Sequence, residues 1–194
     1  MPDTPTRERR SIPWLAAAAI VLVTTVALRC EGRIWWCACG SPRPWAADVW
    51  SSHCSQHLVD AYSVTHVSHG LIFFWLFAWL LPRWRVASRL VCALALAAAW
   101  EVAENSAFVI ERYRTETMSL EYLGDSVANA LADVAFCALG FLAAGRLGLV
   151  RTVAQFVATE LLLLLWIRDN LTLNVLMLIT PIDAIKAWQT FGHR

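Results

Sequence analysis

The chain has 194 residues, of which 58% are hydrophobic and 16% are charged, and its formal net charge at pH 7 is +1. Soluble domains carry about 25% charged residues, so this composition favours a membrane protein over a soluble one. The near-neutral charge, without a basic stripe interleaved with aromatic residues, gives no indication of a nucleic-acid partner. The length allows a single domain, residues 1–194.

Five segments are apolar over a length that can cross a bilayer, which needs about 20 residues of helix. A last apolar run, residues 171–182, is too short to span alone and contains Asn174 and Pro181. It is expected to be re-entrant or interfacial, with a tilted sixth helix as the alternative. The predicted fold class is an all-α polytopic membrane helix bundle. Its predicted spans are residues 12–28, 64–81, 87–110, 126–145 and 149–167.

The first predicted span has a second interpretation. Arg7, Arg9 and Arg10 precede a short apolar core, as in a cleaved signal peptide. The small-x-small pattern of a cleavage site is poor around Arg29, which favours a span that is retained.

Basic residues near the ends of the spans predict the orientation, because short cytoplasmic loops carry an excess of Lys and Arg. Residues 1–11 contain three arginines, and the junctions 82–89 and 146–151 contain five arginines and no acid. These segments should lie on the cytoplasmic side. Residues 29–63 then form an outward loop, and residues 111–125 lie on the same outer side.

Four of the six cysteines fall in the outward loop, where disulfides can form. The Cys37-Ala38-Cys39 spacing matches neither the C-x-x-C redox motif nor the usual zinc motifs. The sequence allows a structural disulfide within this loop, and four cysteines permit three full pairings. The four residues are Cys30, Cys37, Cys39 and Cys54.

Ionisable and amide side chains within the spans gather in the outward half of the bundle. A charged or imidazole side chain in hydrocarbon is costly, so such residues are by default site candidates. Spacings of three and four residues place them on one face of each helix. Because lipid cannot satisfy them, they should face one another around a polar cavity that opens outward. They are His66, His69, Glu101, Glu104, Asn105, Asp125, Asn129 and Asp133.

Three kinds of chemistry would use this set. His66 and His69 could bind a divalent metal such as zinc, with one position left open for water. Glu101, Glu104 and Asp125 are the catalytic candidates, because neighbouring carboxyl groups can divide into acid and base when burial separates their pKa values. The same chain of groups could instead relay protons or ions. No H-E-x-x-H, G-x-S-x-G or phosphate-binding loop is present to decide among them.

Structural interpretations compete with each of these. The histidines could only hydrogen-bond neighbouring helices, and the glutamates could pair with Arg112, Arg114 or Arg168. Three functions therefore stay open: an enzyme that acts on a lipid or lipid-linked envelope substrate, a small transporter or ion-handling protein, and an assembly factor without catalysis. The inner halves of the second and third spans are apolar, which disfavours transport. Oligomeric state is left open.

Several of these stretches also resemble a known family. They are residues 32–37 (GRIWWC), 50–53 (WSSH), 65–70 (THVSHG), 100–106 (WEVAENS), 122–126 (YLGDS) and 166–174 (WIRDNLTLN). Together they resemble the bacterial multi-pass membrane proteins of Uncharacterised Protein Family 0314, over residues 32–189. This resemblance implies a multi-pass protein of the bacterial inner membrane and assigns no reaction. A more distant similarity is to VanZ-like membrane proteins, which also place acidic and amide residues on adjacent spans.

Overall fold

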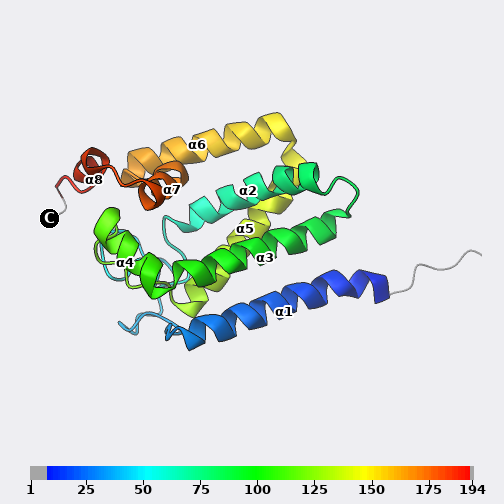
Figure 1. The fold of residues 1–194 in the computed structure, drawn as a ribbon, viewed down its shortest axis with the longest axis horizontal. Helices are drawn as coiled ribbons and strands as arrows, with labels where there is room; N and C mark the ends of the chain where they lie inside the picture. Colours follow the sequence, from blue (N-terminus) through cyan, green and yellow to red (C-terminus); the bar gives the residue numbers. More distant parts are fainter. Residues whose placement is uncertain (1–7, 193–194) are drawn as a thin grey trace, which may run out of the picture.

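The computed structural model describes the backbone of residues 8–192 and the side chains of residues 13–192. Residues 1–7, most of the predicted cytoplasmic N-terminus, lie outside the described residues. Over the described part the chain forms helices and no named strand, so the predicted all-α fold is confirmed. The helices (Figure 1) are α1 (Glu8–Cys30), α2 (Ser63–Leu80), α3 (Val86–Glu104), α4 (Ala107–Glu116), α5 (Val127–Leu147), α6 (Leu149–Ile167), α7 (Leu171–Ile179) and α8 (Asp183–Gln189).

Five of these helices, α1, α2, α3, α5 and α6, are long and apolar enough to cross a membrane, as predicted. In Figure 1 they form one bundle, with α5 passing behind α2 and α3. Large apolar side chains cover the outside of the bundle: Leu165 is 84% exposed and Val150 is 83% exposed. Such surface is unfavourable in water and suits contact with lipid. The fold is that of a polytopic membrane protein.

The third predicted span, residues 87–110, was too long, because the helix ends at Glu104. Ser106 begins a separate helix, α4, and its hydroxyl oxygen accepts a hydrogen bond from the N–H of Val109. Serine at this position satisfies one of the unpaired N–H groups at a helix start. The break also frees the side chain of Asn105 to turn toward the interior of the bundle.

The helices of the C-terminal segment are too short to span a membrane. Helix α7 has nine residues, which at 1.5 Å per residue is about 14 Å, half the thickness of a hydrocarbon core. The predicted short C-terminal segment is confirmed, and a sixth helix of membrane-spanning length is not formed in the described residues. The re-entrant or interfacial placement of the segment stays a prediction. The turn into α7 places Arg168 in the left-handed region, with φ of 56°.

The tightest contact in the bundle is between α2 and α5, where two glycines face the opposite backbone. A Cβ atom on Gly70 would lie 2.0 Å from the carbonyl oxygen of Cys137, and one on Gly140 would lie 2.0 Å from that of Val67. Small residues at helix interfaces allow this close approach. No larger side chain fits at either position without moving a backbone.

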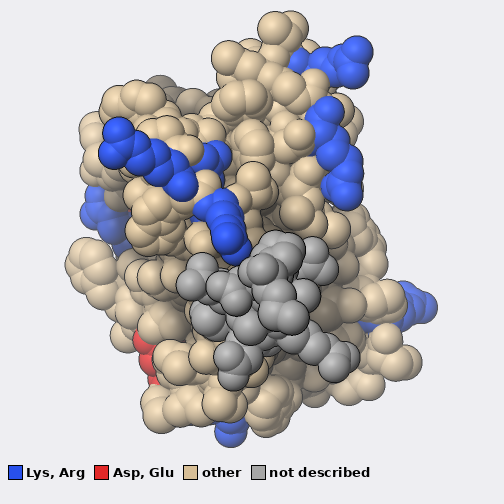
Figure 2. Space-filling view, turned by 90° about the vertical axis from the view of Figure 1, so that its right-hand side faces the viewer, with Lys and Arg blue, Asp and Glu red and all other residues tan. Residues whose placement is uncertain are grey.

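The two ends of the bundle differ in character. We call the end where residues 31–62, α4, α7 and α8 lie the loop end, and the opposite end, with the α2–α3 and α5–α6 turns, the arginine end (Figure 1). Figure 2 shows the arginine end, where Lys and Arg atoms are spread over the face and acidic atoms are almost missing. The exposed arginines of the two turns are Arg83, Arg85, Arg146 and Arg151.

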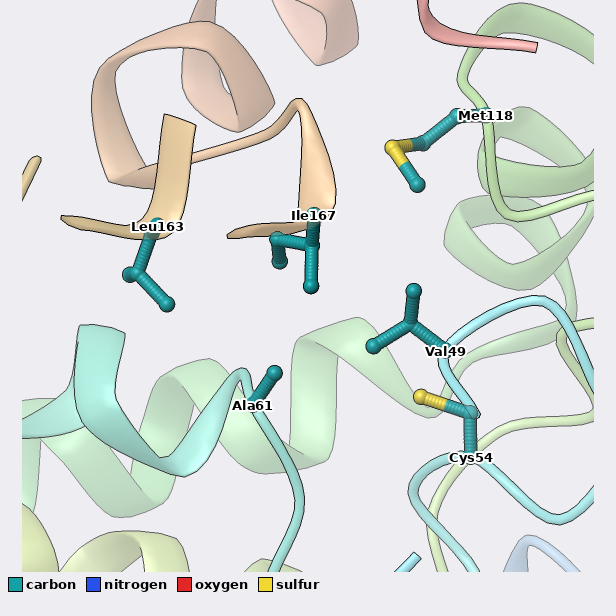
Figure 3. Packing of buried hydrophobic residues seen from close by; sticks show 6 residues of the cluster. All are labelled: Val49, Cys54, Ala61, Met118, Leu163 and Ile167. Carbon is teal, nitrogen blue, oxygen red and sulfur yellow. The ribbon is translucent and has the colours of Figure 1, made fainter. Parts of the chain in front are cut away.

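At the loop end, the α1–α2 loop is anchored by a buried apolar cluster. Figure 3 shows side chains from three parts of the chain converging there. The loop contributes three residues, the chain after α4 contributes one, and α6 contributes two. The cluster consists of Val49, Cys54, Ala61, Met118, Leu163 and Ile167. This packing holds an otherwise irregular loop against the ends of the membrane helices.

Candidate functional site

Polar side chains surround a cavity at the loop end, between α2, α3, α4, α5 and α7. The cavity leaves about 50 Å³ to the centres of water-sized molecules. One water needs about 10–15 Å³ on this measure, so there is room for a few waters or an ion. The ionisable and phenolic side chains that line it are Tyr62, His66, His69, Glu104, Tyr113, Tyr122, Asp125 and Asp133.

His66 lies at the centre of the buried polar cluster, between α3 and α5. Its Nδ1 atom is 3.3 Å from Oε1 of Glu101, and its Nε2 atom is 3.8 Å from Oδ2 of Asp133. Neither contact has hydrogen-bond geometry. The Nδ1 atom of His66, both carboxyl oxygens of Glu101 and Oδ1 of Asp133 are buried without a hydrogen-bond partner, as are both side-chain atoms of Asn129.

Such atoms are rare in folded proteins, where the great majority of buried polar atoms are paired. Glu101 has no exposed surface at all. His66, Glu101 and Asp133 therefore lie close together with buried polar atoms that the protein leaves unsatisfied. A ligand that offers positive charge would satisfy the carboxyl oxygens of this group.

Asp125, by contrast, is fully held by the protein. Its carboxyl oxygens accept hydrogen bonds from Asn105 Nδ2 at 2.7 Å and from the hydroxyl of Tyr122 at 2.9 Å. Its backbone N–H donates to Asn105 Oδ1 at 2.7 Å. The preceding Gly124 has φ of 86°, a conformation that favours glycine. Burial raises the pKa of Asp125 to about 6, although the two donors oppose the rise.

The remaining two predicted residues flank this centre. The ring of His69 lies 5.1 Å from that of His66 and stacks on Phe73 at 5.9 Å. Glu104 also lines the cavity. His66, Glu101 and Glu104 each offer one ligand atom, and these three atoms lie within 4.8 Å of one another. That group is a possible metal site, and it does not include His69.

Two of the three arginines considered as partners for the glutamates form hydrogen bonds elsewhere. Arg112 donates to the carbonyl oxygens of Leu178 and Ile179, and Arg168 donates to that of Phe191. Within residues 13–192, no Lys or Arg forms an ion pair with Glu101 or Glu104. The ion-pair interpretation is therefore wrong. The carboxyl groups of the cavity have no permanent cation beside them.

Glu160, which the sequence places in the fifth span, does not line the cavity. Its two carboxyl oxygens accept hydrogen bonds from the N–H groups of Leu171 and Thr172, at 3.1 and 3.0 Å. A carboxylate is favourable at a helix N-terminus, where N–H groups are unpaired. Glu160 thus fixes the start of α7 against α6.

The cysteines of the loop form no disulfide, so the bridge considered from the sequence is wrong for this structure. Cys37 Sγ lies 3.2 Å from Nδ1 of His53, and Cys39 Sγ lies 3.7 Å from Nε2 of His57. Sequence reasoning missed this cluster, because the C-x-C spacing is short for a metal site. The His53-x₃-His57 spacing was the available signal, since it matches the histidine half of many zinc sites.

Sequence reasoning also passed over the tyrosines. All three tyrosines of the chain line the cavity, and each donates its hydroxyl to a polar side chain around it. The pairs are Tyr62 with Asp169, Tyr113 with Asn174, and Tyr122 with Asp125. The first two pairs join the C-terminal segment to the wall of the cavity.

Fold and site together define a polytopic helical membrane protein with an intramembrane carboxylate and imidazole cluster near one end of the bundle. The chain belongs to the family described as protein of unknown function (DUF2585), whose model matches residues 28–191. This confirms the resemblance found in the sequence motifs. No solved structure matches the chain at a significant level.

Three similar proteins illustrate the family. A UPF0314 protein of Brucella anthropi is 42% identical over 186 residues, which cover 96% of this chain and 94% of the relative. UPF0314 protein R03235 of Rhizobium meliloti is 46% identical over 94% of this chain and 93% of its own. A UPF0314 protein of Sphingopyxis alaskensis is 45% identical over 92% of this chain and 95% of its own. The chain therefore matches these bacterial proteins over nearly their whole length.

Proposed function

We propose that this protein is a membrane-embedded hydrolase or group transferase that acts on a lipid or lipid-linked substrate of the cell envelope. The observation that carries the proposal is the buried cluster around His66. Glu101 and Asp133 flank this imidazole with unpaired oxygen atoms, and no Lys or Arg of the described chain pairs with them. Buried ionisable groups in a membrane are costly and mark functional sites.

A divalent cation such as zinc is the ligand that best fits the unpaired atoms. His66, Glu101 and Glu104 bring one ligand atom each to within 4.8 Å of one another. Three protein ligands of this kind, with a fourth position left open, are typical of catalytic zinc sites. When bound, such an ion polarises a carbonyl or phosphoryl oxygen and makes a water more acidic. His69 lies beside this group and extends the polar wall toward Phe73.

Asp125 is proposed as the group that moves a proton. It lines the cavity, is held by Asn105 and Tyr122, and its pKa of about 6 is close to neutrality. Acid–base catalysis is most efficient when the pKa of the group lies near the working pH. A carboxyl group that is both fixed in position and raised in pKa meets both requirements.

The proposed orientation places the cavity on the outer side of the inner membrane. The two turns of the arginine end carry exposed arginines and no acid (Figure 2), whereas the loop end mixes Lys and Arg with Asp and Glu. Cytoplasmic loops are enriched in Lys and Arg. The N-terminus then lies in the cytoplasm and the loop end faces outward. Envelope lipids and lipid-linked precursors are the substrates available to a site at that surface.

A second candidate is an ion-handling protein, and it is favoured by the small size of the cavity. The close approach of α2 and α5 argues against it. Gly70, the residue after His69, packs on the backbone of Cys137, and Gly140 packs on that of Val67, both too closely for a Cβ atom. An ion could reach the cluster from the loop end, but this contact obstructs its passage between α2 and α5.

The test is to purify the protein in mild detergent with the variants Glu101→Gln and Glu111→Gln. Glu111 is exposed on α4 and serves as the matched control. Each protein is incubated with vesicles of phosphatidylethanolamine and phosphatidylglycerol that carry a lipid-linked sugar, and the products are resolved by mass spectrometry. We expect turnover by the native protein and the control, and a loss of at least about 100-fold in Glu101→Gln.

The outcomes separate the candidates. No product with any of these lipids would count against the enzyme. Ion flux in proteoliposomes that depends on Glu101 would support the ion-handling candidate instead. A folded Glu101→Gln variant that matches the native protein in both assays would leave the cluster a structural network.

A further inference from the structure

A second group of metal-ligating side chains lies in the α1–α2 loop, apart from the cavity. Cys37, Cys39, His53 and His57 each bring one ligand atom to within 4.8 Å of the other three. Two thiols come from one part of the loop and two imidazoles from another, 14 residues further along. Convergence of all four at one point is more than two separate sulfur–imidazole hydrogen bonds would require.

We infer that Cys37, Cys39, His53 and His57 form a tetrahedral Zn²⁺ site that closes the α1–α2 loop. Zinc bonds of about 2.3 Å to sulfur and 2.0–2.1 Å to nitrogen place tetrahedral ligand atoms about 3.3–3.8 Å apart. The two sulfur–nitrogen distances are 3.2 Å for Cys37 with His53, just below this range, and 3.7 Å for Cys39 with His57, within it. Two thiolates and two imidazoles form a common ligand set of structural zinc.

Further contacts orient the ligands, as second-shell groups do at known metal sites. Nδ1 of His57 lies 2.6 Å from the carbonyl oxygen of Arg43, so it donates its proton there and leaves the Nε2 lone pair directed toward Cys39. A metal-ligating histidine almost always donates its other N–H in this way. The N–H of Ser41 also approaches Cys39 Sγ, at 3.5 Å.

A tight turn explains how the short C-x-C spacing can serve one ion. The N–H of Gly40 donates to the carbonyl oxygen of Cys37 at 3.1 Å, and Gly40 has φ of 69°. The chain thus reverses immediately after Cys39, and both sulfur atoms face the histidines. Cys39 and His53 are exposed, whereas Cys37 and His57 are buried, so an ion can enter from the loop surface.

The site would have a clear structural task. The loop lacks helices and ladders, but its backbone caps the start of α5. The carbonyl oxygens of Ile34, Trp35 and Ser55 accept hydrogen bonds from the N–H groups of Val127, Ala128 and Ser126. These acceptors come from both halves of the loop, so an ion that ties the halves together would hold this cap. The inference does not depend on the proposed enzymatic function.

The experiment uses the whole protein in mild detergent, reduced, stripped with a chelator and titrated with Co²⁺. We expect one equivalent to give the visible bands of tetrahedral cobalt together with thiolate-to-cobalt charge transfer, and Zn²⁺ to displace it. Cys37→Ser and His57→Ala should lose the charge-transfer band or reduce Co²⁺ affinity at least about 10-fold. The control Cys30→Ser removes an exposed loop thiol outside the cluster and should match the native protein.

A His66→Ala variant keeps this test separate from the cavity. It should retain the full thiolate–cobalt band even if the proposed active site is lost. The inference is overturned if the reduced native protein gives no thiolate–cobalt band, or if the band persists when both Cys37 and Cys39 are replaced by serine. The first of these results requires no variant, so misfolding of a variant cannot obscure it.

Discussion

Replacing Glu160 tests how the short helix α7 is held beside α6. Its carboxylate accepts the N–H groups of Leu171 and Thr172, while Asn170 accepts that of Leu173 at 2.8 Å. The first turn of a helix has no intrahelical partners for these donors. Because Glu160 is buried, water cannot easily replace it when it is removed.

The expected magnitude follows from the two bonds. A hydrogen bond to a charged group contributes about 1.5–3 kcal/mol to the free energy of unfolding. Loss of both bonds in Glu160→Ala should therefore lower that free energy by about 3 kcal/mol or more. Glu160→Gln keeps one acceptor oxygen and should cost about half as much. In a protein of this size, 1 kcal/mol corresponds to about 2–4 °C in Tm. The alanine variant should therefore melt at least about 6 °C lower than the native protein.

The measurement is thermal unfolding in one detergent, followed by intrinsic tryptophan fluorescence, with hydrogen exchange of residues 171–189 as a local readout. Gln155→Ala is the matched control, because Gln155 is a long polar residue on the same helix that is exposed and donates a hydrogen bond to Thr159. It should change Tm by less than about 1 °C. A Glu160→Ala protein with native Tm and native exchange in α7 would refute this account of the C-terminal segment.

Three further predictions use the same melting assay. Gly140→Ala should lower the free energy of unfolding by about 3 kcal/mol or more, because its Cβ would meet a backbone oxygen. In the control Gly145→Ala the Cβ meets only the ring of Phe74, so the loss of stability should be smaller. Equal losses in the two variants would contradict the close contact. Asn105→Ala should lower the free energy of unfolding by about 2–4 kcal/mol, because both hydrogen bonds to Asp125 are lost. The neighbouring cap variant Ser106→Ala is the control and should lower it by about 1 kcal/mol. A loss in Asn105→Ala no larger than in this control would contradict the prediction. Burial raises the pKa of Asp169 from 3.8 to about 6, so its contribution to stability is complete below pH 3.8 and is lost as pH rises through 6. Asp169→Asn should therefore remove a loss of up to about 3 kcal/mol between pH 4 and 7, and an unchanged pH profile would count against the raised pKa.

The five spans could be predicted because length and apolar composition are enough to define a membrane helix. Helix α6 was predicted to the residue, at 149–167. The end of α3 could not be predicted in the same way, because the apolar pattern continues through residues 107–110. What ends the helix is local competition: Ser106 caps a new helix, and Asn105 turns inward to bind Asp125. The contact of Asn105 depends on Asp125, which is 20 residues further along the chain.

The two candidate sites also differ in how far the sequence could predict them. His66, Glu101 and Glu104 could be found because a polar residue inside a membrane helix is conspicuous, and helical spacing predicts which face it occupies. The Cys37 and His53 group lies in a loop where polar residues are ordinary and no periodicity relates one segment to another. Its convergence depends on the turn at Gly40 and on packing of the loop against α5, and neither is visible in spacing alone.

The buried carboxyl groups of this protein differ in how many hydrogen bonds they accept. Asp60 accepts hydrogen bonds from three backbone N–H groups, and Asp125 accepts two from side chains. These carboxyl groups show that the fold can satisfy a buried acid where the role is structural or the position must be fixed. Glu101 is buried just as deeply and receives no hydrogen bond, although it lies 3.3 Å from His66. Unpaired buried oxygen atoms of this kind are rare in a structural network, whereas a site that binds a cation needs those oxygen atoms free.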